Sequence, residues 1–368
     1  MSCDAVTCCQ TLAEAWSSQP LAAGFLRGLP ELAPFYPYAP SPDASDAAWA
    51  AREAQTFRAD RGAVATALRE LLAPLGITAA QQANLDLLAH DGTGVVVTGQ
   101  QPGLFGGPLY SLHKALTAVV EADRLTALGR PTVPVFWMAT EDDDWAEVSS
   151  TTSIDRGDGL RRLTLGQEPC SCHYVGDVRL EPEAIADLLA QLTEALPGGE
   201  HTDWLLALLA AQSEAVSTFG LWFARVWQAL LGGTGLLLLD PTQPALRALA
   251  VPFAQRALAD PLAATRLAGE AGVALDALGY KPATHRAADL CAFYLVEDQC
   301  RRRLTFDGTH LNAASGLRLT PEEMAERVAA EPTLMSTGVL LRPVLQDYLL
   351  PTAGFVVGPG EIAYAAQV

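Results

Sequence analysis

Basic residues are scarce in this sequence. Its 368 residues include 24 Lys and Arg against 42 Asp and Glu, so the formal net charge is −18 at pH 7. Nucleic-acid binding needs a basic surface that neutralises phosphates, and this balance therefore argues against a nucleic-acid partner. It also disfavours binding to an anionic membrane surface. An anionic small molecule is still compatible with it, because a few arginines inside a cleft can reverse the local potential.

Long apolar runs are missing as well. No stretch approaches the ~20 apolar residues that cross a bilayer, and the N-terminus has neither the basic region nor the apolar run of a secretory signal. We therefore expect a soluble, cytoplasmic protein with no membrane partner. Half of the residues are apolar, and no charge block, low-complexity tract or internal repeat interrupts them, which is typical of a globular chain.

The cysteines form no complete metal-binding pattern. There are seven, an odd number, and in a reducing compartment we expect most of them to be free thiols. Cys170, Cys172 and His173 lie close together, but a second pair of ligands at the usual zinc spacing is absent from the sequence. We therefore expect no tightly bound structural metal and interpret these thiols as lying on a β-hairpin.

Hydrophobic periodicity predicts an α/β protein with a doubly wound, Rossmann-like parallel sheet. The β-branched run at 94–98 and the apolar run at 133–139 are typical of buried strands. Between them, residues 108–129 carry the apolar stripe of a helix. Strand, helix and strand in this order form a right-handed crossover unit. Two further short strands are predicted at 235–240 and 354–358.

These patterns divide the chain into a core and two insertions. The predicted parts are a helical N-terminal lead-in at 1–92, core segments at 93–150, 234–262 and 337–368, and inserted segments at 151–233 and 263–336. Each insertion breaks the strand–helix rhythm with hairpin-like runs. The chain ends on an apolar run without a helix stop signal, so we expect the last core segment to be interrupted at its C-terminus.

The residues that follow each predicted strand are the first candidates for a binding site, because ligands of open α/β sheets bind outside the carboxyl ends of the strands. Four segments occupy these positions: 98–107, 140–145, 240–243 and 358–361. The first is rich in glycine, and backbone N–H groups at a strand-to-helix junction can hold phosphate. Its spacing matches neither the Walker nor the dinucleotide-binding motif.

The glycine-rich segment therefore has two interpretations. The glycines at 106–107 are enough to explain a tight turn, whereas the adjacent glutamines at 100–101 favour a binding role. His113 and Lys114 lie in the first turns of the next helix. They either reach an anion bound at the start of that helix or form a solvated face.

Four carboxylates, Glu141 to Asp144, follow the buried strand at 133–139. Their mutual repulsion is costly without a counter-ion. Magnesium carried by a nucleotide would neutralise them, since this ion favours one or two carboxylates together with phosphate oxygens. Capping of the following helix is the alternative.

Arg342 and Gln346 lie among apolar residues. A half-buried arginine suits bidentate recognition of a carboxylate, and a structural ion pair with Asp347 is the alternative. A second basic stretch, Arg301 to Arg303, falls on a predicted hairpin, and we interpret it as exposed surface.

Four motifs in this order resemble the BshC family, the enzymes that add cysteine in bacillithiol biosynthesis. The motifs are Val97–Tyr110, Pro134–Asp142, Leu341–Asp347 and Gly358–Tyr364. The resemblance is weak from Pro34 and strong from Val95 to the end. It implies a Rossmann-like core with inserted connecting segments, a nucleotide site, and a C-terminal coiled coil through which the family forms homodimers. We expect this coiled coil to be missing from the chain, and by the resemblance Asp143 stands where family members usually carry a histidine.

The family reaction joins the carboxyl group of L-cysteine to the amine of glucosaminyl malate. A free carboxylate is a poor acceptor for an amine, so the resemblance implies activation by ATP, with ADP as the related nucleotide, and Mg²⁺. Another nucleotide-dependent transferase on the same fold, or an inactive fragment, are the alternatives.

The resemblance also assigns expected roles to individual residues. The catalytic candidates are Glu141, Asp142 and Asp144, with Mg²⁺ near Glu141 or Asp142. The substrate-binding candidates are Gln100, Gln101, Arg342, Gln346, Glu361 and Tyr364. The nucleotide-binding candidates are Gly99, Gly103, Gly106, Gly107, His113, Lys114, Gly358 and Gly360.

Overall fold

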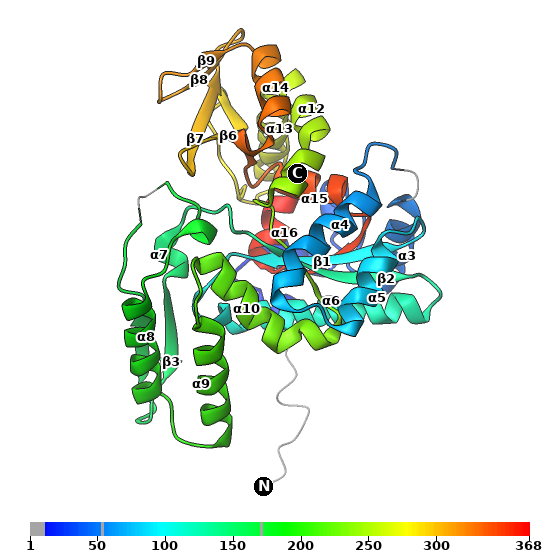
Figure 1. Cartoon of the computed structure of the whole chain (residues 1–368). Helices are drawn as coiled ribbons and strands as arrows, with labels where there is room; N and C mark the ends of the chain where they lie inside the picture. Colours follow the sequence, from blue (N-terminus) through cyan, green and yellow to red (C-terminus); the bar gives the residue numbers. More distant parts are fainter. Residues whose placement is uncertain (1–11, 53–54, 170–171) are drawn as a thin grey trace.

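A four-stranded parallel sheet lies at the centre of the structure. The computed structural model describes residues 12–52, 55–169 and 172–368 (Figure 1). The strand order is β11 (Thr352–Phe355), β1 (Gly94–Gln100), β2 (Thr132–Met138) and β5 (Leu237–Leu239), and all neighbouring pairs are parallel. All of β2 and β5 is buried, which explains their continuous apolar sequence. The predicted parallel α/β sheet is confirmed.

Helices cover both faces of this sheet, as a doubly wound fold requires. Successive side chains of a strand point to opposite faces. Val95 and Val97 of β1 belong to the core cluster that includes two helices preceding the sheet, whereas Val96 packs with the helix that connects β1 to β2. These helices are α4 (Arg61–Leu72) and α5 (Ala79–Leu88) on the first face and α6 (Leu109–Ala127) on the second.

The N-terminal part of the described chain is helical. Its helix α2 contacts α16 near the end of the chain, and the hydroxyl of Tyr36 donates to the carbonyl oxygen of Ile362 at 2.8 Å. The N-terminal helices therefore brace the end of the core. The elements of this part are α1 (Leu12–Ala15), α2 (Pro20–Leu26), η2 (Pro30–Phe35), α3 (Pro42–Ala51) and η4 (Ala73–Leu75), and α16 spans Pro359–Ala365.

The first insertion forms a lobe with its own hydrophobic cluster. Its last helix, α10, faces two cores: Phe219 and Trp222 pack in the lobe, whereas the Trp227 ring lies 4.0 Å from that of Phe136 in β2, measured between centroids. The elements of this part are α7 (Trp145–Val148), β3 (Ser150–Ile154), β4 (Leu160–Thr164), η6 (Val175–Asp177), α8 (Pro182–Ala195), α9 (Glu200–Ser213), α10 (Phe219–Leu231) and η7 (Gly232–Thr234). The short helix η5 (Leu104–Gly106) belongs to the core loop after β1 and contacts α10.

The second insertion contains a five-stranded antiparallel sheet that the sequence analysis did not predict as a whole. The predicted hairpin is confirmed as β6 and β7, and its turn meets the first insertion, where the backbone N–H of Tyr174 donates to the carbonyl oxygen of Gln299 at 3.3 Å (Figure 1). The strand order is β10 (Met335–Thr337), β6 (Leu290–Glu297), β7 (Cys300–Phe306), β8 (Leu311–Ala313) and β9 (Arg318–Leu319). The helices of this part and of the core segments on either side of it are α11 (Pro244–Leu249), α12 (Val251–Ala259), α13 (Ala263–Ala277), α14 (Pro321–Ala330), η8 (Pro332–Leu334) and α15 (Arg342–Leu349).

None of the helices in residues 12–52, 55–169 and 172–368 has the length and apolarity that a membrane span requires.

A disulfide between Cys172 and Cys300 joins the two insertions. The backbone N–H of Arg301 also donates to the carbonyl oxygen of Cys172 at 3.0 Å, so the two segments run side by side. The interpretation of Cys172 as a free thiol on a hairpin is therefore wrong, because its partner lies 128 positions away and local spacing could not reveal it.

Cys291 is free and buried, and burial raises the pKa of its thiol to about 12. Cys170 lies outside the described residues.

We expect alkylation of the unfolded, unreduced chain to label Cys291 but neither Cys172 nor Cys300, because only a free thiol reacts. Peptide mapping by mass spectrometry before and after reduction measures this. Cys291 serves as the internal control, since it lies on the same hairpin. Labelling of Cys300 without reductant would contradict the disulfide.

Candidate functional site

A cavity of about 1430 Å³ opens at the carboxyl ends of three parallel strands. Its floor is formed by the segments after β1, β2 and β11, and its opposite wall by the second insertion. Twelve of the candidate residues line it: Gly99, Gln100, Gln101, His113, Lys114, Glu141, Asp142, Arg342, Gly358, Gly360, Glu361 and Tyr364. The parallel sheet brings these residues together from distant positions in the sequence, because its strands end at one edge.

The other five candidates lie outside this cavity. Gly103 and Gly107 line a smaller neighbouring cavity of about 500 Å³, and Gly106 accepts a hydrogen bond from Trp227 Nε1 at 3.0 Å. Asp144 caps α7, and Gln346 is buried beside Arg342. Their predicted roles in binding or catalysis stay predictions.

The glycine-rich loop is shaped by its own backbone. Gly106 and Gly107 have φ of 98° and 83°, a region that residues with a side chain rarely adopt. A Cβ on Gly103 would lie 2.8 Å from the Cα of Gly107. These three positions therefore need glycine for the turn itself, as the tight-turn interpretation held.

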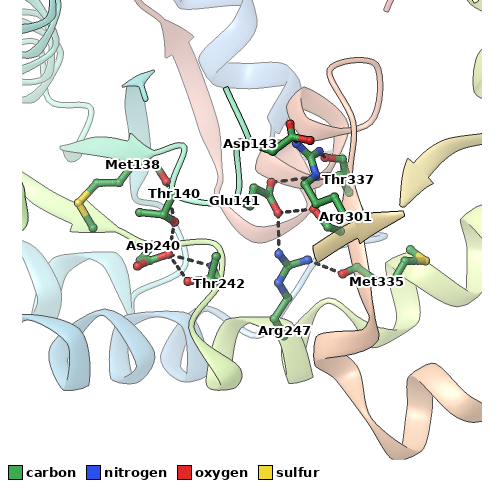
Figure 2. Close-up of polar contacts among 11 residues, drawn as sticks. Met138, Thr140, Glu141, Asp143, Asp240, Thr242, Arg247, Arg301, Met335 and Thr337 are labelled. Carbon is green, nitrogen blue, oxygen red and sulfur yellow. Dashed lines mark hydrogen bonds and ion pairs between the residues drawn. The ribbon is translucent and has the colours of Figure 1, made fainter. Parts of the chain in front are cut away.

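Glu141 is engaged by protein groups on both carboxylate oxygens (Figure 2). Arg247 of α11 lies 2.6 Å from Oε2, and both side chains are only 5% exposed. Ser336 donates to the same oxygen at 2.9 Å, and Thr337 reaches Oε1 at 3.5 Å. The guanidinium of Arg247 also donates to the carbonyl oxygen of Met335. This cluster joins the end of β2 to β10 of the second insertion.

Arg247 is a structural residue that the sequence analysis did not single out. Burial alone would lower its pKa, but the carboxylate of Glu141 raises it above the ordinary value. The predicted need for a counter-ion at the acidic segment is thus met for Glu141 by an arginine. The only local signal was a basic residue within the apolar helix at 244–250.

The remaining carboxylates of the acidic segment have different surroundings. Asp142 Oδ1 accepts from the backbone N–H of Asp143 at 2.7 Å and of Asp144 at 3.1 Å, and Oδ2 accepts from Gln101 at 3.4 Å. Asp143 lies 3.6 Å from Arg301. Burial raises the pKa of Asp143, and Arg301 opposes that shift. Capping of the following helix, the alternative to metal binding, is therefore seen for Asp144, whereas Asp142 binds the backbone of the turn before that helix.

The strand end after β5 does not open into the large cavity. Asp240 accepts hydrogen bonds from the hydroxyl of Thr140 and from the backbone N–H and hydroxyl of Thr242 (Figure 2). Desolvation raises the pKa of the Asp240 carboxyl. This segment fixes the end of β2 against that of β5, which is a structural role.

Lys114 links the ends of two strands. Its ammonium donates to the carbonyl oxygen of Gly99 and to Glu361, both at 2.7 Å, and the residue is 9% exposed. Glu361 in turn accepts from the backbone N–H of Gly358 at 2.8 Å. The solvated-face alternative therefore applies only to His113, which is exposed at the cavity.

Arg342 reaches the cavity without a carboxylate partner in the described part of the chain. Its guanidinium donates to the hydroxyl of Tyr364 and to Gln346 Oε1, the latter at 3.5 Å. The ion pair with Asp347, which was the alternative role, is not present among these residues. The guanidinium fork is thus held by neutral groups, which leaves its charge available to a ligand.

The interpretation of Arg301 to Arg303 as exposed surface is wrong for Arg301. Its side chain is 9% exposed and donates to the carbonyl oxygen of Thr337 at 2.8 Å. Arg301 and Arg303 both line the cavity, whereas Arg302 does not. Strand alternation could have separated Arg302 from its neighbours, but only the fold shows which face meets the cavity.

Comparison with known proteins gives a consistent family match. A family model described as "Bacillithiol biosynthesis BshC, N-terminal Rossmann-like domain" matches residues 1–368. Proteins named "Putative cysteine ligase BshC" are 36% identical over 98% of this chain in Koribacter versatilis and 33% over 84% in Symbiobacterium thermophilum. A third, from Shouchella clausii, is 34% identical over 84%. The chain spans 66%, 58% and 57% of the lengths of these three relatives.

Proposed function

Because the chain belongs to the BshC family, we propose that it provides the Rossmann-like part of a ligase that joins L-cysteine to the amine of glucosaminyl malate. The observation that carries the proposal is the cavity at the strand ends, where carboxylates, amides and an arginine without a carboxylate partner among the described residues meet. Such a set can hold two small polar substrates and position an amine beside a carboxyl group.

The reaction needs an activated carboxyl group, and we propose that ATP with Mg²⁺ supplies the activation. A Cβ placed on Gly360 would meet no atom within 4 Å, so the backbone at Gly358–Gly360 leaves room for phosphate in the cavity. We place the metal near Asp142, which faces the cavity, because Glu141 is neutralised by Arg247.

The two glutamines at the end of β1 would orient the substrates. Gln100 donates to Gln101 at 2.8 Å, and Gln101 donates to Glu147 at 3.0 Å, so both amides are held in a defined network beside the cavity. Desolvation, assisted by Asp144 and Asp142, raises the pKa of Glu147. A network of this kind preorganises polar groups at a binding site.

Deletion of the gene in its source organism tests the proposed function. Thiol-labelled mass spectrometry should show loss of bacillithiol together with build-up of glucosaminyl malate. Unchanged levels of both would contradict the proposal. Product formation by the purified protein without any nucleotide would separately reject activation by ATP.

We propose that Arg342 binds a carboxylate of the malate group. Arg342→Ala is therefore expected to raise the KM for glucosaminyl malate by about tenfold or more, because this charge-assisted hydrogen bond is lost. The KM for L-cysteine should stay unchanged and serves as the internal control. Arg342→Lys keeps the charge but loses the fork, so an intermediate KM is expected. Steady-state kinetics with each substrate varied in turn measures this, and equal KM values for the wild type and Arg342→Ala would rule out the role.

A further inference from the structure

Three arginines gather around one tyrosine on the wall that the second insertion contributes to the cavity. The guanidinium carbon of Arg301 lies 4.1 Å from the ring centroid of Tyr294, and Arg286 Nη2 lies 3.5 Å from its hydroxyl oxygen. Arg303 is the cross-strand partner of Tyr294 in the β6–β7 pair. All four residues line the cavity. We call this group the arginine wall.

Two of the three arginines in the wall, Arg286 and Arg303, have no carboxylate partner among the described residues. Among the described carboxylates, only Asp143 comes within 4.0 Å of any of its guanidinium groups, at 3.6 Å from Arg301. The Nε of Arg301 is buried and has no hydrogen-bond partner. Like charges held together destabilise one another unless an opposite charge lies between them. In a chain with a net charge of −18, three positive groups on one cavity wall indicate an anionic ligand.

The backbone next to the wall is shaped to let the arginines approach. A Cβ on Gly338, which follows β10, would lie 3.1 Å from the Tyr294 ring, 3.3 Å from Arg286 Nη1 and 2.9 Å from the carbonyl oxygen of Ala292. Any larger residue would push the tyrosine and Arg286 away from the cavity. Arg301 is fixed from the same side by the carbonyl oxygen of Thr337. Arg301 and Arg286 are therefore held in place before a ligand binds, whereas Arg303 is an exposed side chain placed by the pairing of β6 and β7.

We propose that the arginine wall binds the dicarboxylate end of the amine substrate. This inference rests on the proposed function and adds the part of the molecule that selects the substrate. A dicarboxylate presents two planar groups with about four lone-pair sites each, so together they can accept N–H bonds from three guanidinium groups. Arg342 of the core offers one of these groups, and Arg286 and Arg303 of the wall offer two more, none of which is paired with a described carboxylate. At the core end of the cavity, by contrast, the charge of Lys114 is already neutralised by Glu361.

Titration of the whole chain by isothermal calorimetry tests the proposal. Glucosaminyl malate without L-cysteine is the first probe, since no reaction can follow, and inorganic pyrophosphate is the second. Arg286→Ala and Arg303→Ala should each weaken binding of glucosaminyl malate by about tenfold, as expected for one lost charge-assisted contact. Arg303→Gln keeps the bulk of an exposed side chain and should give the same loss.

Arg302→Ala is the matched control, because this residue lies on the same strand, carries the same charge and does not line the cavity. Its affinity should equal that of the wild type. The proposal is overturned if Arg286→Ala and Arg303→Ala bind glucosaminyl malate normally. If these variants lose only pyrophosphate binding, the wall serves phosphate groups, which also overturns the dicarboxylate assignment. Neither result depends on ligase activity, so the bacillithiol measurement judges the proposed function separately.

Discussion

Glu141→Leu is expected to lower the free energy of unfolding by about 3–5 kcal/mol, which is the usual cost of removing one partner of a buried ion pair. The substitution leaves the guanidinium of Arg247 buried without its carboxylate, and it also removes the acceptor of Ser336. Arg247→Met should be destabilising for the complementary reason. Denaturant-induced unfolding of the wild type and both variants at pH 7 measures these changes.

Two controls separate the buried pair from a general effect of charge removal. The double variant Glu141→Leu with Arg247→Met should recover most of the loss, because no unpaired charge stays buried. Glu194→Leu removes the partner of Arg161 in an exposed pair, with side chains 72% and 38% exposed, and should cost less than about 1 kcal/mol. If the single variants at 141 and 247 unfold like the wild type, the buried pair does not stabilise the fold.

Gly99→Ala is expected to destabilise the central sheet by about 3 kcal/mol, at the upper end of what overpacking costs. The added Cβ would lie 2.7 Å from the backbone oxygen of Trp137 in the neighbouring strand. Backbone of a fully buried strand cannot move aside as a flexible side chain can. Thermal and denaturant unfolding measure the loss.

Gly354→Ala is the matched variant for this test. It lies in β11 on the other side of β1, and its Cβ would meet Val96 Cγ2 at 3.6 Å, an ordinary contact. We expect its stability to stay within about 1 kcal/mol of the wild type, since alanine also restricts the unfolded chain. Equal effects of the two variants would show that crowding against Trp137 is not what requires glycine at position 99.

Local patterns were sufficient to predict the central sheet. The buried strands appear in the sequence as short apolar runs, and the helix between the first two of them as an apolar stripe. The convergence of three strand ends also followed from sequence, because parallel strands place their carboxyl ends at one edge. These features depend on neighbouring residues or on a general rule of topology.

Features that join distant segments could not be predicted in this way. Cys172 and Cys300 approach each other only because both insertions fold, and Arg301 enters the cavity only because its hairpin pairs with β10 through β6. The surroundings of the acidic segment, Glu141 to Asp144, could be predicted only in part. Its repulsion predicted a counter-ion, but the identity of that ion as Arg247 depends on where α11 packs.

The two sides of the cavity have separate structural support, and this bears on how the protein can evolve. The floor of the cavity belongs to the parallel sheet, whereas Tyr294, Arg301 and Arg303 stand on a sheet whose hydrophobic cluster is distinct. Substitutions at hairpin positions that do not contact the acidic segment, such as Arg303, can therefore accumulate without disturbing the floor. Selection can retune which molecule is accepted on one side while the chemistry on the other is inherited unchanged.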